Sequence, residues 1–506
     1  MLHLKSADLM KEKIESLVIP VCEDKNIHED KTILSLIRSA KKVKAFKGDK
    51  DDEVILYNLS EVKAQIIIFL GLGKVEKVDM ESLRTMAGKA VKGVIKKKHT
   101  EVLIAVPLAA KVKMDMQNIL EAMMEGAFLG NHFYDKYKKE KKLQPLERID
   151  FLVTSHEAGK YRKLPSRIST ICQGTILARE WVSMPPNDKR PALFAQSIAR
   201  LAGKENLKVT VLGEKELKQK KFGAILAVAA GSRNKPKMVI LEHNPVKAKK
   251  TIAFVGKGVT FDSGGINLKP SASLADMKMD MSGAAAVAAT LITAARLKLR
   301  LNLVGVIPIV ENMPSGAASR PGDIIKSYDG KTVEIGNTDA EGRLILIDAI
   351  SYAIKKYKPQ TLIDLATLTG ACVVALGEKI AGTFSYDDKL AENIILSGHK
   401  THERCWRMPM PEDYKELIKS DFADLNNVGS TRYGGAITAA LFLSEFVKDT
   451  SWAHIDIAGP AYAKKESSYC GVGGTGFGVR LLLDLMERLY PEKNRIPIKE
   501  KLGPDV

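Results

Sequence analysis

The chain has 506 residues, of which 45% are hydrophobic and 27% are charged, and its net charge is +18. This length exceeds what one hydrophobic core usually supports, so we expect two domains. No segment approaches the roughly 18 to 20 apolar residues that span a bilayer, and the five cysteines lie far apart without a CxxC pair. A membrane partner, a disulfide framework and a thiolate zinc site are therefore not expected.

The first residues mix acids with lysines and lack the apolar stretch of a secretory signal, which favours a cytoplasmic protein. The positive charge is spread along the chain rather than gathered in a tail. Lysine runs such as 96–98 and 136–142 are more typical of solvated helix ends than of a phosphate-binding stripe. A nucleic-acid partner is thus not favoured, while acidic partners stay open.

Strands and helices are predicted to alternate along the chain. Continuously apolar runs at 65–71, 101–107 and 149–154 are typical of buried strands, with helices near 79–97 and 115–130. A helical run over 168–182, followed by Pro185 and Pro186, is expected to connect two domains. Beyond it we expect strands at 208–212, 237–241, 251–256, 301–310 and 361–365, and helices at 283–297 and 344–356.

This alternation predicts an α/β fold with two domains, each a mainly parallel mixed sheet flanked by helices. The expected divisions are an amino-terminal α/β domain over 1–165, a linker helix over 166–190 and a catalytic domain over 191–506.

Four carboxylates and two lysines occur in two glycine-rich parts of the second domain, namely Lys257, Asp262, Lys269, Asp280, Asp339 and Glu341. The strand at 251–255 delivers a lysine at its carboxyl end, where open α/β sheets place their ligand crevice. Acids packed this densely need cations beyond the nearby lysines. An aspartate before a helix also fits a simple N-cap, but a second acidic motif at another helix start favours a metal pocket.

The ligand types narrow the choice of metal. Four carboxylates match the charge of two divalent ions, as in two-metal hydrolases. Oxygen ligands with one amine suit zinc, manganese or magnesium better than copper or iron–sulfur clusters. A lysine ligand has to be neutral, so its pKa must lie well below the ordinary value, and burial and nearby cations act in that direction.

These segments resemble the signature of the leucyl aminopeptidases of peptidase family M17, the cytosol aminopeptidases. The matching motifs are Asn337-Thr-Asp-Ala-Glu-Gly-Arg-Leu344 and Val255-Gly-Lys-Gly-Val-Thr-Phe-Asp-Ser-Gly-Gly265, and similar stretches follow at 364–371, 406–410, 420–427, 434–440 and 452–459. The resemblance is strong over about residues 170–490. The amino-terminal part matches only in its layout, that of a macro-like domain.

The resemblance implies a set of metal ligands. Lys257, Asp262, Asp280 and Glu341 would hold one ion, and Asp262, Asp339 and Glu341 would hold the other. The ions would be manganese or zinc. Asp262 and Glu341 occur in both ligand sets, so their carboxylates would bridge the two ions.

The resemblance also implies catalytic and substrate-binding roles. Lys269 would stabilise the oxyanion that develops at the peptide carbonyl, and Arg343 would position a bicarbonate ion that acts as general base. The substrate would contact Met277, Asn337, Thr367, Leu368, Gly370 and Ala458. The implied activity is release of amino-terminal residues, preferentially leucine, from peptides by a homohexamer.

Two positions depart from the family pattern. Ala461 stands where larger residues are common, which predicts a broadened side-chain preference, and Ser183 stands where asparagine is common, which we interpret as structural.

Two rival functions are a two-metal phosphoester hydrolase, since paired metals on carboxylates also cleave phosphate esters, and a DNA-binding regulatory protein. Asp262-Ser-Gly-Gly265 also echoes a serine-protease motif but lacks a base, and His454 is expected to be a core residue rather than a ligand.

Overall fold

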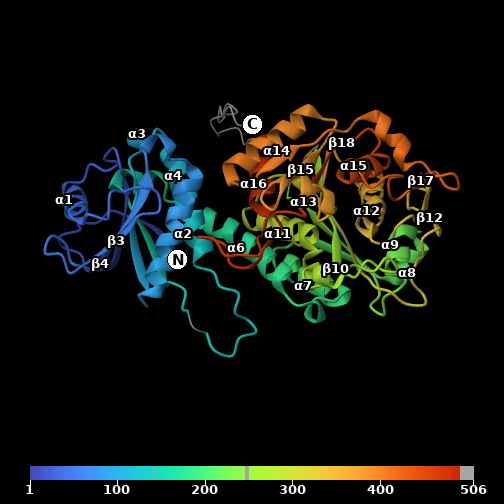
Figure 1. The fold of residues 1–506 in the computed structure, drawn as a ribbon, viewed down its shortest axis with the longest axis horizontal. Helices are drawn as coiled ribbons and strands as arrows, with labels where there is room; N and C mark the ends of the chain where they lie inside the picture. Colours follow the sequence, from blue (N-terminus) through green and yellow to red (C-terminus); the bar gives the residue numbers. More distant parts are fainter. Residues whose placement is uncertain (142, 246–249, 491–506) are drawn as a thin grey trace. The chain divides into compact units, whose positions relative to one another are not determined.

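The computed structural model describes residues 1–141, 143–245 and 250–490, and the chain divides into two compact units (Figure 1). The first unit contains Met1–Gln173 and a returning segment, Lys465–Val472. The second contains Gly174–Lys464 and the chain from Gly473 onward. The division falls inside α6 (Leu164–Ser183), the helix expected over 168–182, which is therefore confirmed as a helix that connects the units.

The first unit is built on a six-stranded sheet in the order β1-β6-β5-β2-β4-β3. Every neighbouring pair is parallel except β3 and β4. The strands are β1 (Leu2–Lys5), β2 (Ile14–Cys22), β3 (Glu53–Tyr57), β4 (Ala64–Gly73), β5 (Glu101–Ala105) and β6 (Arg148–Leu152). The helices are α1 (Lys31–Ala40), α2 (Met80–Lys96), α3 (Ala109–Val112), α4 (Met116–Gly130) and α5 (Ser155–Lys160). The mainly parallel α/β architecture is thus confirmed here.

The returning segment packs on α2 of the same unit. Lys92 Nζ donates to the Ser467 carbonyl at 2.5 Å. Gly88 allows a close approach, because a Cβ added there would lie 2.7 Å from the carbonyl oxygen of Ser468. Residues distant in sequence therefore complete one side of this helix.

The second unit contains a nine-stranded sheet in the order β16-β15-β18-β14-β9-β11-β8-β7, with β10 paired to β11. The central strands β18, β14, β9 and β11 are mutually parallel, and β8, β7 and β15 introduce antiparallel pairs. The strands are β7 (Lys208–Leu212), β8 (Lys237–His243), β9 (Thr251–Gly256), β10 (Gly258–Asp262), β11 (Asn302–Asn312), β14 (Thr361–Ala366), β15 (Ala381–Phe384), β16 (Cys405–Arg407) and β18 (Ser451–Asp456). The mixed, mainly parallel sheet is confirmed.

Smaller strands and ten helices surround this sheet in the described part of the unit. The strands are β12 (Ile324–Lys326), β13 (Thr332–Glu334), β17 (Leu425–Asn426), β19 (Tyr462–Ala463) and β20 (Gly473–Gly474). The helices are α7 (Pro191–Lys204), α8 (Glu214–Gln219), α9 (Gly223–Ala229), α10 (Ser271–Leu274), α11 (Ser282–Arg296), α12 (Glu341–Tyr357), α13 (Gly370–Leu376), α14 (Asp388–Thr401), α15 (Gly435–Ser444) and α16 (Val479–Leu489).

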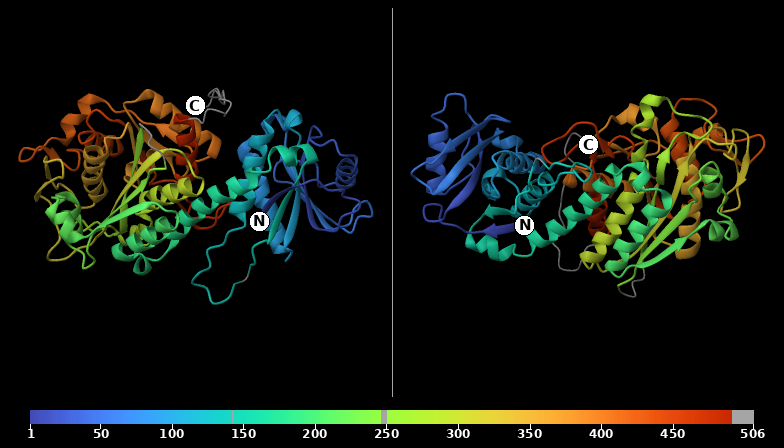
Figure 2. Two further views of the ribbon diagram at one scale, coloured as in Figure 1. Left: turned by 180° about the vertical axis from the view of Figure 1, so that it is seen from behind. Right: turned by 90° about the horizontal axis from the view of Figure 1, so that it is seen from below.

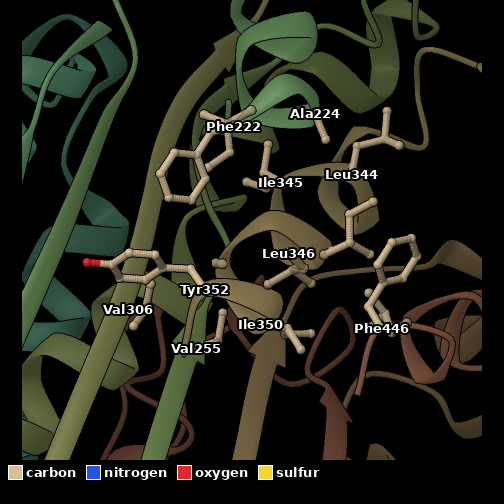
Figure 3. Packing of buried hydrophobic residues seen from close by; sticks show 14 of the residues in the cluster. Phe222, Ala224, Val255, Val306, Leu344, Ile345, Leu346, Ile350, Tyr352 and Phe446 are labelled. Carbon is tan, nitrogen blue, oxygen red and sulfur yellow. The ribbon is translucent and has the colours of Figure 1, made fainter. Parts of the chain in front are cut away.

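Helices α11 and α12 cover opposite faces of the central strands, and this layering can be followed in Figure 2. Val306 of β11 packs in the cluster formed by α12, together with Val255, Leu344 and Phe446 (Figure 3). The neighbouring Gly305 faces the other way, where α11 side chains would meet an added Cβ at 3.1 Å. Since successive strand residues alternate between faces, α11 and α12 must lie on opposite sides. Both helices begin at the carboxyl ends of the central strands.

None of the helices in the described ranges combines the length and apolarity needed to cross a membrane.

Candidate active site

The acidic and basic residues predicted from the sequence converge at the carboxyl ends of the central strands. Lys257 follows β9, Asp262 ends β10 and Thr367 follows β14. Asp280 lies two residues before α11, and Glu341 is the first residue of α12. Parallel strands end at the same edge of a sheet, where doubly wound folds bind their ligands.

Three carboxylates form the centre of the site. Asp262, Asp280 and Glu341 are each at most 4% exposed, and one oxygen from each lies within 4.8 Å of the others. Burial raises the pKa of Asp280 well above its ordinary value and, together with Glu341, raises the pKa of Asp262. Oδ2 of Asp280 is buried without a hydrogen-bond partner in the described structure. A divalent cation would satisfy this oxygen and offset the repulsion between the acids.

Lys257 completes one side of this carboxylate cluster. Its Nζ lies 2.7 Å from Asp280 Oδ1 and 2.8 Å from Glu341 Oε1, and it donates to the Thr367 carbonyl at 2.9 Å. Burial alone would lower the pKa of the amine, but the two carboxylates outweigh it and raise the pKa. A metal that takes this amine as a ligand therefore has to displace a proton that the neighbouring acids favour.

Lys269 and Asp339 lie on the other side of the cluster. Lys269 Nζ contacts Asp262 Oδ2 at 2.9 Å and Asp339 Oδ1 at 2.5 Å. The Lys269 side chain is 16% exposed and that of Asp339 32% exposed, so this side opens towards solvent. Asp339 joins the cluster through Lys269 and does not belong to the three acids whose oxygens converge.

Two glycines make this packing possible. A Cβ added at Gly342 would lie 2.5 Å from Lys257 Cε, inside ordinary contact distance. Gly264 has φ of +87°, and an added Cβ there would lie 2.3 Å from the Asn267 carbonyl oxygen. The glycines of the motifs are therefore needed for close approach and for a left-handed turn.

Arg343 is buried beside the cluster and is only partly bonded. Its Nη1 donates to the Asn427 carbonyl at 2.7 Å, while Nε is buried and has no hydrogen-bond partner within the described ranges. Burial lowers the pKa of the guanidinium to about 10, which leaves it protonated at neutral pH. A planar cation with a free donor suits a planar oxyanion such as bicarbonate.

The residues expected to contact the substrate lie on four segments near these groups. Met277 opens the turn before Asp280, and Ala458 follows β18. Thr367 Oγ1 donates to Asp280 Oδ1 at 2.7 Å. Gly370 faces open space, because an added Cβ would meet nothing within 4 Å.

Asn337 serves its own motif in a way that the sequence does not reveal. Its side-chain oxygen accepts the backbone N–H of Asp339 at 2.8 Å. Its carbonyl accepts from Asn427 Nδ2 at 2.8 Å. These contacts fix the turn that carries Asp339 into the site.

Comparison with known families agrees with this geometry. The catalytic domain of the cytosol aminopeptidase family, Peptidase M17, matches residues 176–483, and the amino-terminal domain of the same family matches residues 22–141. The chain belongs to the cytosol aminopeptidase family. It is therefore an aminopeptidase, a hydrolase of a metal-dependent family.

Relatives cover nearly the whole chain. A probable cytosol aminopeptidase of Syntrophotalea carbinolica is 42% identical over 88% of this chain and 90% of its own length. One from Chlorobium phaeobacteroides is 41% identical over 96% and 98%. Among solved structures, the bottromycin maturation enzyme BotP in complex with Mn has a TM-score of 0.84 at 32% identity, covering 94% of this chain and 99% of its own. A mutant of tomato leucine aminopeptidase has the same TM-score and identity, covering 96% and 95%.

Three supporting residues of this cytosol aminopeptidase are not among those that the sequence predicts. Asn312, at the end of β11, donates to Asp262 Oδ1 at 2.8 Å. Asp456, at the end of β18, accepts hydrogen bonds from the loop that carries Thr367. Asp364 lies in β14, the strand that leads into the same loop. Asn312 and Asp456 lie at the carboxyl ends of parallel strands. A polar residue at such a strand end is the sequence signal that predicted Lys257, and it could have predicted these two residues as well.

The rival readings of Ser263 and His454 can now be compared with the structure. Ser263 Oγ donates to the Asn312 carbonyl at 2.7 Å, which commits its proton to the backbone. His454 is 1% exposed, and its Nδ1 lies 2.6 Å from Oδ1 of Asp364. The other oxygen of Asp364, Oδ2, accepts the N–H of Trp452 Nε1 at 2.7 Å. The histidine is a core residue paired with an acid, as predicted. Ser183 Oγ accepts the N–H of Gly474 at 2.9 Å, which fits its structural interpretation.

Proposed function

We propose that this cytosol aminopeptidase releases amino-terminal residues from peptides with a preference for leucine, using two divalent ions, manganese or zinc, and bicarbonate as general base. The observation that carries the proposal is the convergence of three buried carboxylates on one point, beside an unpartnered oxygen of Asp280. The catalytic residues would belong to the stretch 191–506, with 1–165 as a separate domain and 166–190 as the linker.

The donor set fits two ions. Lys257, Asp262, Asp280 and Glu341 would hold one, and Asp262, Glu341 and the more exposed Asp339 would hold the other. When bound, divalent ions supply positive charge that polarises a peptide carbonyl and lowers the pKa of water. The free amine of a peptide would compete for the same charge, which explains selection for chain ends.

The chain's own cations would handle the remaining charges. Lys269 lies at the open side of the cluster and keeps its proton, because Asp262 and other nearby carboxylates raise the pKa of its amine against the opposing effect of burial. It is thus suited to stabilise the oxyanion of the tetrahedral intermediate. Arg343 has a free Nε donor and would hold bicarbonate at the point where a proton leaves the attacking water.

The pocket for the first side chain would lie between Thr367–Gly370 on one segment and Met277 and Ala458 on the others. Met277 and Ala458 are apolar, and Gly370 leaves room, which suits leucine. Ala461 is small and 1% exposed, so a broadened preference is expected through packing behind the pocket rather than direct contact. We further propose a cytoplasmic homohexamer, which light scattering would reject by finding an active monomer.

The decisive assay compares leucine p-nitroanilide with p-nitrophenyl phosphate, each with added Mn²⁺ and after chelation. We expect turnover of the anilide only, lost with chelator and restored by metal. Turnover of the phosphate alone would favour a two-metal phosphoester hydrolase. Omission of bicarbonate from degassed buffer should lower the rate, and salt-sensitive retention on duplex DNA would instead indicate the regulatory alternative.

A further inference from the structure

Asp456, the last residue of β18, is a buried acid to which the proposed chemistry gives no role. It is fully buried, and burial raises the pKa of its carboxyl group. Its Oδ1 accepts the backbone N–H groups of Leu368 and Ala458, each at 3.1 Å, and its Oδ2 accepts the hydroxyl of Thr369 at 2.8 Å. These hydrogen bonds offset part of the cost of burying the acid, and all three go to residues around the candidate pocket.

One of these contacts reaches the carboxylate cluster through a single peptide group. The N–H of Leu368 donates to Asp456, while the carbonyl of the same peptide, that of Thr367, accepts Lys257 Nζ at 2.9 Å. A trans peptide is planar, so its N–H and C=O point in opposite directions and turn together. The position of Asp456 therefore fixes the direction of the carbonyl that holds Lys257.

The other two contacts fix both sides of the proposed side-chain pocket. Thr369 Oγ1 also accepts the N–H of Cys372 at 3.0 Å, and so caps α13, which begins at Gly370. Ala458 lies on the segment after β18. A single carboxylate thus ties the loop after β14 to the segment after β18.

We propose that Asp456 is a positioning residue of the aminopeptidase site. It holds the Thr367–Leu368 peptide in the orientation that directs Lys257 towards the carboxylate cluster, and it sets the spacing between Gly370 and Ala458 that admits the first side chain of the substrate. The second role rests on the proposed function, whereas the first depends only on the carboxylate cluster binding a metal.

Three substitutions separate a positioning role from a role of charge. Asp456→Asn keeps an oxygen for the two amide groups but removes the charge, Asp456→Glu keeps the charge but moves the oxygens by one methylene, and Asp456→Ala removes every acceptor. Isothermal titration with Mn²⁺ should give an affinity for the Asn variant within about threefold of wild type. The Glu and Ala variants should bind about 10- to 100-fold more weakly, as is typical when a partner that orients a metal ligand is lost.

The substrate pocket supplies a second measurement. The ratio of kcat/KM for leucine and alanine p-nitroanilides should shift by about tenfold in the Glu and Ala variants, since a small change in an apolar pocket alters discrimination between side chains by about 10-fold or more. In the Asn variant this ratio should stay near that of wild type. A role limited to stability would leave the ratio unchanged in all three.

Asp348 in α12 offers a matched control. It is also fully buried, and it accepts the backbone N–H groups of Ala224, Ile225 and Tyr328 at 2.7–3.0 Å. The same three substitutions at Asp348 should change stability without changing Mn²⁺ affinity or the substrate ratio of the folded protein.

Two results would overturn the inference. One is wild-type affinity and selectivity in every Asp456 variant, and the other is loss in Asp456→Asn with retention in Asp456→Glu, which would indicate a role of charge. If Asp456→Ala does not fold, the Mn²⁺ affinities and substrate ratios of Asp456→Asn and Asp456→Glu still distinguish a positioning role from a role of charge. Wild-type protein that binds Mn²⁺ but cleaves no aminoacyl anilide would refute the proposed activity, while the affinities would still test how Asp456 acts on Lys257.

Discussion

Replacement of Gly342 by alanine tests whether the position of Lys257 controls the site. The added methyl group would lie 2.5 Å from Lys257 Cε and 2.7 Å from its Nζ. Ordinary contact begins at 3.4 Å, so the end of the lysine would have to move by about 1 Å. The side chain has little room to do so, because it is 3% exposed.

The expected effect is large on function and moderate on stability. Lys257 holds its three partners at 2.7–2.9 Å, and a shift of about 1 Å would take these contacts beyond hydrogen-bond length. A displacement of that size in a catalytic group can cost about 10²-fold in rate. Alanine in a helix is favoured over glycine by roughly 0.5 to 1 kcal/mol, but overpacking against the buried lysine costs about 1 to 3 kcal/mol, so the free energy of unfolding should fall by about 1 to 2 kcal/mol.

The assay is kcat/KM for leucine p-nitroanilide, with Mn²⁺ affinity by calorimetry and Tm by circular dichroism. Gly203→Ala in α7 is the matched control, since an added Cβ there meets nothing within 4 Å. It should gain helix stability and keep full activity. Wild-type activity and metal affinity in Gly342→Ala would refute the reasoning, because they would show that the site does not depend on where Lys257 lies.

Further predictions concern three acidic or basic side chains. Glu341→Ala should lose bound metal and activity together, as measured by elemental analysis and anilide turnover, and retention of both ions would exclude it as a bridge. Lys269→Ala should keep its metal while kcat falls by about 10² to 10³; loss of metal would instead make Lys269 part of the metal site. Burial raises the pKa of Asp348 to about 7, above that of the unfolded chain, so its contribution to stability is present at low pH and is lost as pH rises through 7. Between pH 5 and 8, the free energy of unfolding measured with urea should therefore fall by about 2 to 3 kcal/mol more in wild type than in Asp348→Asn. If this free energy depends on pH equally in both proteins, the three amide donors keep Asp348 ionised.

Much of the site could be predicted because its residues sit where the sequence leaves a strong local signal. The apolar run before Lys257 indicates a buried parallel strand, and the acids before two helices indicate a shared crevice. The structure brings Asp262, Asp280 and Glu341 together as that pattern requires. The long helices near 79–97 and 283–297 were equally plain, the first from an apolar face that repeats over several turns and the second from a continuous run of small and apolar residues.

The remainder depends on contacts that have no local pattern. Asp456 accepts the backbone N–H of Leu368 and the hydroxyl of Thr369, which are almost 90 positions away, and a backbone group looks the same at every position in a sequence. The raised pKa of Lys257 likewise follows from two acids that approach it only in the folded chain. Strands β15 and β16, at one side of the sheet, are too short for a periodic signal.

The return of Lys465–Val472 to the first unit has a consequence for how the protein can be taken apart. The polypeptide passes between the two units three times, near Gln173, near Lys464 and near Val472. A protease that nicks only the first passage would cut residues 1–173 from the covalent chain, but this fragment would keep its non-covalent contacts with 465–472, which stays bonded to the second unit. Residues 1–173 expressed alone would leave Lys92 and Gly88 without the partners that Ser467 and Ser468 provide. The amino-terminal unit is thus not a detachable module, and its loss in evolution or by engineering would require two separate excisions from the gene, of which one removes the internal stretch 465–472.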